Sequence, residues 1–306
     1  MSALIACMGG ACTDHVVRPT GPVQRDGEVT AQSASWYGGV ALNVAENLQR
    51  IGVPAALVTR IGDDDAGNGL LAHARRAGID VAGVEQAPGD ATAAYLAILE
   101  NGVPLYAFSD MRIFEGFTRA VLDRAWPAAS KARIVFADTN LPCGVLTELA
   151  RRRGDAAFRY VLGVSSVPTA GNVPQRLAGV DLLFMNEAEA AQYLGVTAIS
   201  APDAVSALIA RGAAAVVVTR GRAGCVVGDP EIAAIPSVPA TVVDTTGAGD
   251  ALIAGTLAEL LAGAPVRDAV RAGSVLAAIT VETLGTVSAT LSRSVFEARR
   301  RVAAAS

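Results

Sequence analysis

A turn of small residues beside an aspartate carries the strongest chemical signal in this sequence. The stretch Asp244-Thr245-Thr246-Gly247-Ala248-Gly249-Asp250 opens a long apolar segment with a helical pattern. Its glycines let the backbone approach a ligand closely, and the free N–H groups at a helix start attract an anion such as a phosphate. A carboxylate repels such a ligand, so the presence of Asp250 beside an anion site indicates a chemical role. It could act as a general base that removes the proton from a hydroxyl attacking a phosphoryl group. A plain helix start with an acidic first turn also fits the same residues.

Strands and helices that could position this turn alternate along most of the chain. Short apolar runs predict buried strands at residues 4–8, 55–61, 134–137, 159–164, 182–185 and 215–219. Helical patterns cover residues 40–50, 68–77, 250–262 and 266–281. Residues 92–99 and 103–108 instead flank Glu100-Asn101-Gly102, which indicates a hairpin. We therefore predict a mostly parallel sheet with helices on both faces and a small additional β unit.

Composition excludes several classes of protein. Of the 306 residues, 52% are hydrophobic and only 5% aromatic, which suits helices packed on buried strands. The net charge of -4 argues against a nucleic-acid partner, and the runs Arg151-Arg152-Arg153 and Arg299-Arg300-Arg301 are interpreted as solvated helix faces.

No segment has the length and apolarity of a signal peptide or a membrane span, so we expect a cytoplasmic protein with no membrane partner. The four cysteines show no C-x-x-C spacing and are interpreted as reduced thiols.

Three motifs together resemble the ribokinase (PfkB carbohydrate kinase) family. Residues 244–250 match its D-T-x-G-A-G-D signature, while Gly38-Gly39-x-x-x-Asn43 and Gly62-Asp63-Asp64-x-x-Gly67 match its N-terminal pattern. The resemblance implies an α/β fold with a mostly parallel central sheet flanked by helices and a small β-sheet lid. We expect one kinase domain over residues 1–306, with the lid at about 12–36 and 84–114. The implied activity is ATP-dependent phosphorylation of a hydroxyl, with Mg²⁺ and K⁺.

The resemblance assigns roles around the signature turn. Asp250 would be the catalytic base, and the N–H groups of Gly247, Ala248 and Gly249 would form an anion hole for the transferred phosphoryl group. Asp244 and Thr246 would belong to a monovalent-cation site completed by main-chain oxygens of residues 280–288, although an ordinary loop fits that stretch equally well.

Two further motifs would serve the nucleotide. Asn186 and Glu189 match the family's N-x-x-E motif, in which Glu189 would contact Mg²⁺ through water; a capped helix start explains the same residues. Thr219, Gly221 and Gly224 resemble its T-x-G-x-x-G turn beside the phosphates and ribose, with Arg220 and Arg222 within reach of phosphate oxygens. A structural hairpin turn is the alternative for these glycines.

The acceptor would lie at the other end of the cleft. Asp14, Gly39 and Asn43 match the family's sugar-binding positions, where carboxylate and amide groups suit vicinal hydroxyls. Asp14 follows a predicted tight turn at Gly9-Gly10 that delivers it to a strand end, although it fits an ordinary turn residue and Asn43 a locally satisfied helix amide.

Finer motifs favour one nucleoside as the acceptor. Residues 38–48, 110–115 and 138–142 resemble pseudouridine kinases in particular. On this reading Asn140, Asp110 and Thr92 face the uracil ring, although each also fits a turn or strand-end residue. The expected reaction is phosphorylation of the 5′-hydroxyl of pseudouridine, and we expect a homodimer formed through the lid. A ribose, fructose-type or adenosine kinase, or a binding protein without catalysis, are the alternatives.

Overall fold

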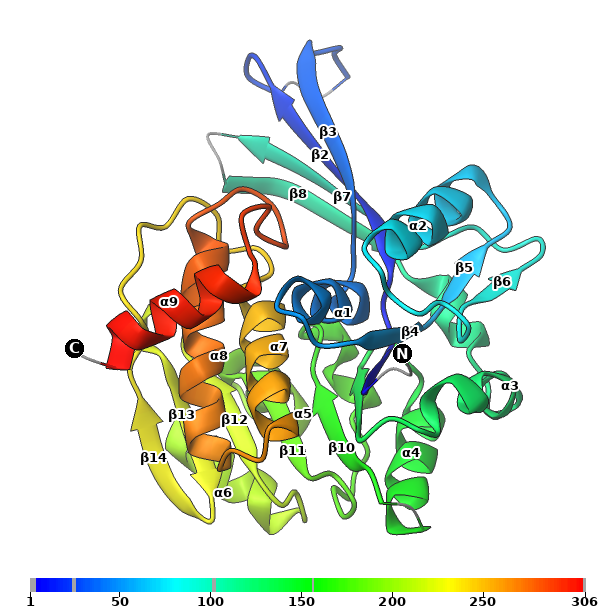
Figure 1. The fold of residues 1–306 in the computed structure, drawn as a ribbon. Helices are drawn as coiled ribbons and strands as arrows, with labels where there is room; N and C mark the ends of the chain where they lie inside the picture. Colours follow the sequence, from blue (N-terminus) through cyan, green and yellow to red (C-terminus); the bar gives the residue numbers. More distant parts are fainter. Residues whose placement is uncertain (1–3, 24–25, 101–102, 156, 305–306) are drawn as a thin grey trace.

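The apolar runs of the sequence form the strands of one large sheet (Figure 1). The structure is a computed structural model that describes residues 4–23, 26–100, 103–155 and 157–304. Strand order in the sheet is β14-β13-β12-β11-β10-β9-β1-β4. The strands from β4 to β12 pair in parallel, and the edge strands β13 and β14 are antiparallel, so the predicted mostly parallel sheet is confirmed. Their bounds are β1 Ile5–Met8, β4 Ala55–Val58, β9 Ile134–Asp138, β10 Arg159–Gly163, β11 Leu182–Asn186, β12 Val216–Thr219, β13 Cys225–Asp229 and β14 Glu231–Ile235.

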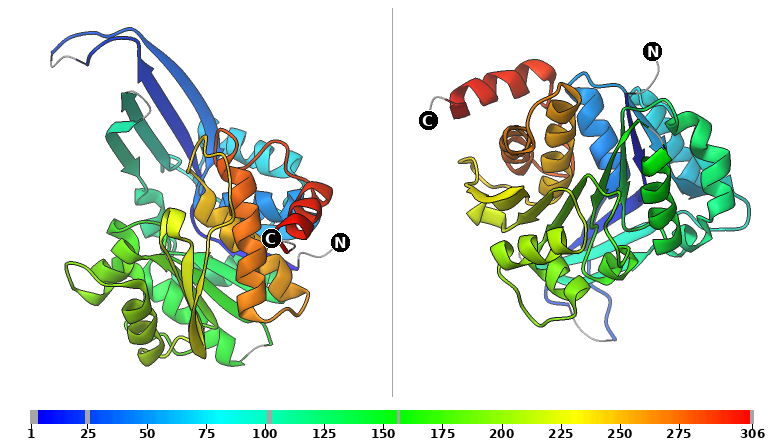
Figure 2. Two further views of the ribbon diagram at one scale, coloured as in Figure 1. Left: turned by 90° about the vertical axis from the view of Figure 1, so that its left-hand side faces the viewer. Right: turned by 90° about the horizontal axis from the view of Figure 1, so that it is seen from below.

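Helices cover both faces of this sheet because its strands are apolar on both sides. Along β1, Ile5 and Cys7 enter one core, whereas Ala6 and Met8 enter the other. The first core includes side chains of α1 (Val40–Arg50), α2 (Asp65–Arg76), α7 (Ala248–Leu261), α8 (Val266–Val281) and α9 (Arg293–Ala304). The second includes α3 (Arg119–Ala129), α4 (Cys143–Asp155), α5 (Glu187–Leu194) and α6 (Ala201–Ala210). Figure 2 shows these two helical layers on opposite sides of the strands.

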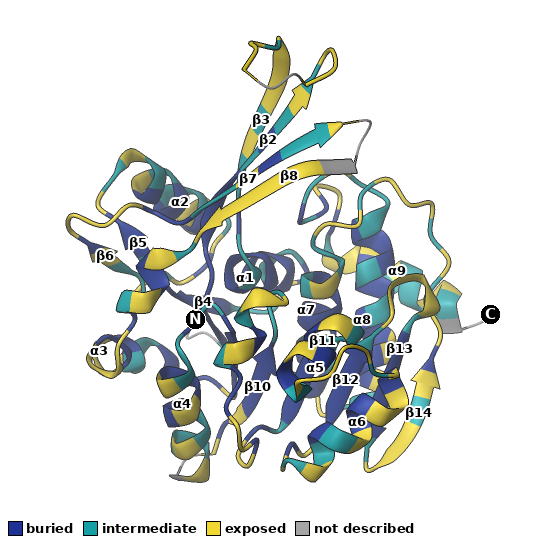
Figure 3. Cartoon of the chain, turned by 180° about the vertical axis from the view of Figure 1, so that it is seen from behind, coloured by how far each residue is buried: buried dark blue, intermediate teal, exposed yellow. Residues whose placement is uncertain are grey.

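A smaller sheet projects from the body of the molecule (Figure 1). Its order is β3-β2-β7-β8, with bounds β2 Cys12–Pro19, β3 Ala31–Gly38, β7 Ala94–Glu100 and β8 Val103–Asp110. These strands lie in the two segments expected to form the lid, apart from the last two residues of β3. The hairpin β7–β8 is confirmed, and Asn101 and Gly102 of its predicted turn lie outside the described residues. Figure 3 shows that β8 is exposed along its described length, in contrast to the buried strands of the main sheet.

Two local predictions were wrong. Residues 55–61 do not form one strand, because the chain leaves the main sheet at Thr59, whose hydroxyl donates to the Gly9 carbonyl at 2.6 Å. The following β5 (Arg60–Gly62) pairs with β6 (Glu85–Ala87) in a two-stranded sheet. Asp14 is not at a strand end, since it is the third residue of β2 and pairs with neighbours on both sides.

The first arginine run is also less solvated than expected. Arg152 is only 13% exposed, packs over the Trp126 ring and pairs with Asp123 and Glu148. Arg153 donates to Asp181 at 2.7 Å. Within the described residues the four cysteines are free, and no helix is long and apolar enough to cross a membrane.

Close packing of α7 against α8 fixes the helix that carries Asp250. A Cβ added at Gly273 of α8 would lie 2.3 Å from the Leu252 carbonyl oxygen of α7. A Cβ at Gly255 of α7 would come within 2.8 Å of the Gly273 Cα. The two backbones therefore touch, which sets the position of the first turn of α7 relative to the rest of the first core.

Candidate active site

The carboxyl ends of the parallel strands bring most of the predicted residues to one edge of the main sheet. Gly9 and Gly10 follow β1, β9 ends at Asp138, β11 at Asn186 and β12 at Thr219. Ligands of open α/β sheets bind outside this edge, because the loops and helix starts there present unpaired polar groups. The first turn of α7 reaches the same region, since Asp250 contacts α1 and senses the charges of Asp14 and Asp138.

The signature turn forms the start of α7. Gly247 is the N-cap with φ +77°, and no side chain caps the helix. A Cβ at this position would lie 2.1 Å from the Thr286 carbonyl oxygen, so the loop after α8 leaves room only for glycine. The first turn therefore has N–H groups without a side-chain cap at an end of the helix where the dipole favours an anion.

Asp250 lies in this first turn with its carboxyl enclosed by protein atoms, although part of the residue is exposed. Asn43 Nδ2 of α1 donates to its Oδ2 at 2.8 Å, so the predicted base and a predicted acceptor-binding residue are in direct contact. Burial raises the pKa of Asp250 to about 7, the negative charges of Asp138 and Asp14 add to this rise, and the Asn43 hydrogen bond opposes it. A carboxylate with a pKa near neutrality is suited to accept a proton from a hydroxyl.

Asp14 approaches the site from the small sheet. Its side chain is buried, accepts a hydrogen bond from the Cys12 thiol at 3.3 Å, and has its pKa raised by burial. Trp36 is its directly opposite partner on β3 and so lies on the same face of the sheet. The buried Trp36 Nε1 faces the Asp14 carboxyl, and this donor lowers the pKa of Asp14 against the larger effect of burial.

Glycines allow the small sheet and α1 to approach the end of β1. A Cβ at Gly38 would lie 2.2 Å from Asp14 Oδ2. Gly39, the N-cap of α1, has φ +99°, and a Cβ there would lie 2.6 Å from the Gly10 carbonyl oxygen. Gly39 and Asn43 thus connect the surroundings of Asp14 to Asp250, and their role in binding an acceptor stays a prediction.

Asp138 accepts several hydrogen bonds at the end of β9 and was not among the predicted site residues. Its Oδ2 accepts from the Gly10 N–H, and its Oδ1 accepts from the backbone N–H and the Nδ2 of Asn140, each at 2.8 Å. Ser165, also missed, donates to the same Oδ1 at 3.2 Å. Burial raises the pKa of Asp138. An acidic residue at the end of a wholly apolar strand was the available signal, because a buried carboxylate needs several donors around it.

Thr92 and Asp110 have their polar groups engaged by other residues. The Thr92 hydroxyl donates to Asp64 Oδ1 at 2.5 Å and accepts from the Gly62 N–H at 2.9 Å. Asp64 also caps α2, so this motif joins the start of α2 to the chain entering β7. Asp110 pairs with Arg112 at 2.6 Å, and that arginine lowers the pKa of Asp110 to about 2.

The loop after α8 contacts the signature turn as a cation site would require. Asp244 Oδ1 accepts from the N–H and the hydroxyl of Thr246, at 2.9 and 2.7 Å, and its Oδ2 accepts from the Gly285 N–H at 3.2 Å. The Thr280 hydroxyl is buried without a partner in the described structure, and it belongs to the α8 residue before Val281, whose carbonyl accepts from the Asp244 N–H. A carboxylate, a hydroxyl and the Thr286 main-chain oxygen are therefore available to a small cation.

Both predicted nucleotide motifs adopt the local structures that the sequence analysis gave as alternatives, a capped helix start and a turn between two strands. Asn186 and Glu189 form a reciprocal capping box on α5, with both hydrogen bonds at 2.8 Å. Burial raises the pKa of Glu189 to about 7. Thr219 is directly opposite Asn186 in the sheet, so the two motifs are adjacent.

The second nucleotide motif makes the connection between β12 and β13. It contains the short 3₁₀ turn η3 (Gly221–Ala223). Gly221 has φ +55° and Gly224 φ +81°, and a Cβ at Gly224 would lie 2.1 Å from the Ile235 carbonyl oxygen. Arg220 lies 3.7 Å from Glu187, and Arg222 is exposed.

A pocket of about 720 Å³ lies beside this turn, which contacts the chain after β14. It lies between residues 235–239, α8 and α9, and Val238, Ser274 and Val275 are among its lining residues. Its volume falls within the range of small-molecule sites.

Comparisons with known proteins agree with this geometry. The profile of the pfkB family of carbohydrate kinases matches residues 2–293. An uncharacterized sugar kinase of Escherichia coli, YeiI, is 31% identical over 249 residues, which cover 79% of this chain and 68% of that protein. The pseudouridine kinase of E. coli is 30% identical over 242 residues, covering 76% of each chain. The structure of Arabidopsis thaliana ribokinase with ribose and ATP superposes with a TM-score of 0.85 at 20% identity, covering 98% of this chain and 99% of that one, which confirms the ribokinase-like fold.

Proposed function

We propose, from the premise that this chain belongs to the pfkB family of carbohydrate kinases, that it phosphorylates the 5′-hydroxyl of pseudouridine with ATP. Membership makes it a kinase that transfers a phosphoryl group to a hydroxyl of a sugar or nucleoside. The observation that carries the proposal is the carboxyl of Asp250, which has a pKa of about 7 and contacts Asn43 at the uncapped start of α7. A binding protein without catalysis would have no use for such a base beside an anion site.

In the proposed reaction Asp250 removes the proton from the acceptor hydroxyl as its oxygen attacks the γ-phosphorus. The bond from phosphorus to the oxygen of the leaving ADP breaks, and the N–H groups of Gly247, Ala248 and Gly249 stabilise the charge on the transferred phosphoryl group. Asn43 holds the Asp250 carboxylate in place through its 2.8 Å hydrogen bond. Asp250 thus acts on the acceptor while the helix start acts on the phosphate.

The acceptor would be held between the small sheet and α1. Asp14 and Asn43 would pair with ribose hydroxyls, and Gly39 leaves space for the sugar. Asn140 would meet the uracil ring. Similarity to E. coli pseudouridine kinase supports this acceptor, and similarity to the sugar kinase YeiI supports a sugar as the alternative. Thr92 and Asp110 stay predictions, because Asp64 and Arg112 already occupy their polar groups.

The nucleotide would extend from the start of α7 along the motifs containing Asn186, Glu189, Thr219, Gly221 and Gly224. The pocket beside Val238 and Ser274 would take its base. No three His, Cys, Asp or Glu side chains of the described residues gather into a metal site, so Mg²⁺ would be bound chiefly by the nucleotide phosphates. Glu189 would contact it through water, and Mg²⁺ would supply neutralisation of the phosphate charge.

A monovalent cation fits the residues around Asp244. The Asp244 carboxylate, the Thr246 and Thr280 hydroxyls and the Thr286 main-chain oxygen would hold K⁺. The unpartnered Thr280 hydroxyl supports this assignment, because a buried oxygen without a partner costs free energy unless a ligand satisfies it.

The small sheet would act as the lid of a single kinase domain and as a dimer interface. Asp14, Tyr95 and Trp36 are directly opposite one another, so they share one face of this sheet. The alternate positions put Phe108, Leu96 and Tyr106 on the other face, where they are 56%, 37% and 53% exposed. A second copy of the chain would cover this apolar face in a cytoplasmic homodimer. Sedimentation of a monomer at micromolar concentration would refute the dimer.

The test of the function is ADP release with ATP and Mg²⁺ against pseudouridine, uridine, adenosine, ribose and fructose 6-phosphate, with and without K⁺. Preference for pseudouridine by kcat/KM is the expected result. Preference for ribose, a fructose-type sugar or adenosine would retain the kinase and replace the acceptor. Asp250→Asn should fold and bind nucleotide but lose several orders of magnitude in kcat, and near-normal turnover in it would remove Asp250 from the role of base.

A further inference from the structure

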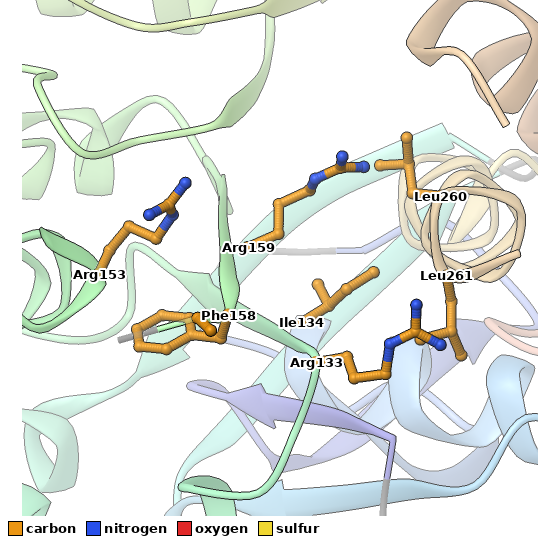
Figure 4. A pocket seen from close by; sticks show the side chains of 8 residues that line it. Arg133, Ile134, Arg153, Phe158, Arg159, Leu260 and Leu261 are labelled. Atoms are coloured by element: carbon orange, nitrogen blue, oxygen red, sulfur yellow. The ribbon is translucent and has the colours of Figure 1, made fainter. Parts of the chain in front are cut away.

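A basic pocket lies at the edge of the main sheet opposite the active site (Figure 4). Arg133 immediately precedes β9, and Arg159 is the first residue of β10. Leu260 and Leu261 belong to the last turn of α7. Since Leu260 is ten residues after Asp250 on α7, this pocket is about 15 Å along the helix from Asp250. A ligand bound there is therefore neither reactant of the kinase.

The two arginines at this edge lack acidic partners in the described part of the chain. Most arginines of the protein are ion-paired there, for example Arg300 with Glu259 of α7 and Arg153 with Asp181. For the Arg133 and Arg159 side chains the structure provides no hydrogen bond or ion pair, and both residues are exposed. Their backbones are joined, because the Arg159 N–H donates to the Arg133 carbonyl at 2.9 Å. Two uncompensated guanidinium groups on adjacent strands favour an anion between them.

Neither arginine is needed to cap the neighbouring helix. The turn after α7 satisfies three of its last four carbonyl groups, since the N–H groups of Ala262, Gly263 and Ala264 donate to the carbonyls of residues 258, 260 and 259. The guanidinium groups thus remain available to a ligand.

Apolar side chains and a third arginine complete the lining of the pocket. Figure 4 shows Arg159 extending toward Leu260 and Arg133 ending beside Leu261, with Ile134 between the strand ends and Phe158 toward Arg153. Arg153 adds a third positive group at the far side, although it already pairs with Asp181 at 2.7 Å. The pocket volume of about 310 Å³ is at the lower end for small-molecule sites. A ligand that fills it needs a compact anionic head for the arginines and a small carbon skeleton for the leucines.

We propose that this pocket binds a small phosphate monoester, with its phosphate between Arg133 and Arg159 and its carbon skeleton against Leu260 and Leu261. Arginine suits this head group because its planar fork donates two parallel hydrogen bonds to a phosphate. A doubly charged phosphate also neutralises both guanidinium groups at once. The site is distinct from the phosphate-binding edge at the start of α7.

The test is calorimetric titration with phenyl phosphate, which joins a phosphate to an apolar ring and does not resemble the acceptor. The intact protein is first saturated with Mg²⁺ and a non-hydrolysable ATP analogue, so that the nucleotide site is filled. Arg133→Ala/Arg159→Ala should weaken binding at least about tenfold, which corresponds to about 1.4 kcal/mol, because both charge-assisted contacts with the phosphate are lost. Arg176→Ala, which removes an exposed arginine outside the pocket, is the matched control and should bind within about twofold of the wild type.

Two further measurements separate the parts of the proposal. Inorganic phosphate, which lacks the carbon skeleton, should bind more weakly than phenyl phosphate, and equal affinity would overturn the assignment to a monoester. Arg159→Lys keeps the charge and loses the fork, so it should bind between the wild type and the double variant. Binding of phenyl phosphate only when the ATP analogue is left out, equal affinity in the double variant, or no binding by the wild type would each overturn the site. Thermal denaturation confirms that the variants fold.

Discussion

Replacement of Asn43 by alanine should move the pH dependence of the reaction upward. The Asn43 amide donates to Asp250 Oδ2 at 2.8 Å and is the group that lowers the pKa of this carboxyl against burial and two neighbouring acids. A hydrogen bond to a charged group contributes about 1.5 to 3 kcal/mol, and one pKa unit corresponds to about 1.4 kcal/mol. We take the lower end of this range and expect the pKa to rise from about 7 to about 8 in Asn43→Ala.

The sign follows from the role of a base, which must be ionised to accept a proton. With a pKa of about 7, roughly a tenth of Asp250 is ionised at pH 6, whereas roughly a hundredth is ionised when the pKa is about 8. The variant should therefore be about tenfold slower at pH 6 from this cause alone, and the two proteins should converge near pH 9. Any difference that remains at high pH measures the contact of Asn43 with the acceptor.

The assay is the initial rate across pH with both substrates far below their KM values, because that rate reports ionisation in the free enzyme. Gln49→Ala is the control, since it removes an amide from the same helix that donates to the Gly78 carbonyl at 2.7 Å, and its pH profile should match the wild type. An Asn43→Ala protein that is folded by circular dichroism yet titrates at the wild-type pH would refute the coupling between Asn43 and Asp250.

Four further outcomes are expected. The pKa of Asp250 is raised to about 7 in the folded protein, so ionisation of Asp250 lowers the free energy of unfolding as pH rises from about 4 to about 7. Asp250→Asn should therefore have a free energy of unfolding up to about 2 kcal/mol above that of the wild type at pH 8, and a smaller difference at pH 5, as measured by urea denaturation. Gly273→Ala should lose about 2 kcal/mol or more, because its Cβ would meet the α7 backbone, whereas Gly144→Ala on α4 has open space and should lose nothing; thermal melting compares them. Asp244→Asn should abolish stimulation by K⁺ relative to choline while Mg²⁺ dependence is retained, and unchanged stimulation would place the cation elsewhere. Thr92→Val should lower the melting temperature with the acceptor KM within about threefold, since its hydroxyl serves Asp64; a larger rise in KM would return it to the acceptor site.

The positions of most strands and the helix start at the signature turn could be predicted because both are local properties of the sequence. Apolar runs bounded by turns located β1 and β9 to β12, and the glycines before Asp250 indicated a helix start open to an anion. The break at Thr59 could not be predicted, because it depends on a hydrogen bond to Gly9, a residue fifty positions earlier.

Long-range contacts also explain the residues that sequence reasoning missed or placed differently. Asp138 looks like the end of an ordinary strand until Gly10 and Ser165 are seen to donate to it. Thr92 carries the same hydroxyl whether it faces an acceptor or Asp64, and only the fold shows the second partner. Buried polar residues are therefore recognisable from sequence as unusual, but their partners are not.

The charges at the active edge explain why a kinase built this way would depend on cations. Asp14, Asp138 and Asp250 are close enough for their charges to raise the pKa of Asp250, and their ligand would be a polyanion. Each negative phosphate oxygen brought to the start of α7 opposes ionisation of the base that must act there. The helix start and its N–H groups would offset part of this repulsion, and Mg²⁺ on the phosphates and the proposed cation at Asp244 would offset more. Because Asp244 and Asp250 flank the same glycine turn, a cation bound at Asp244 would lower the pKa of Asp250, which would tie cation binding to the ionisation of the base.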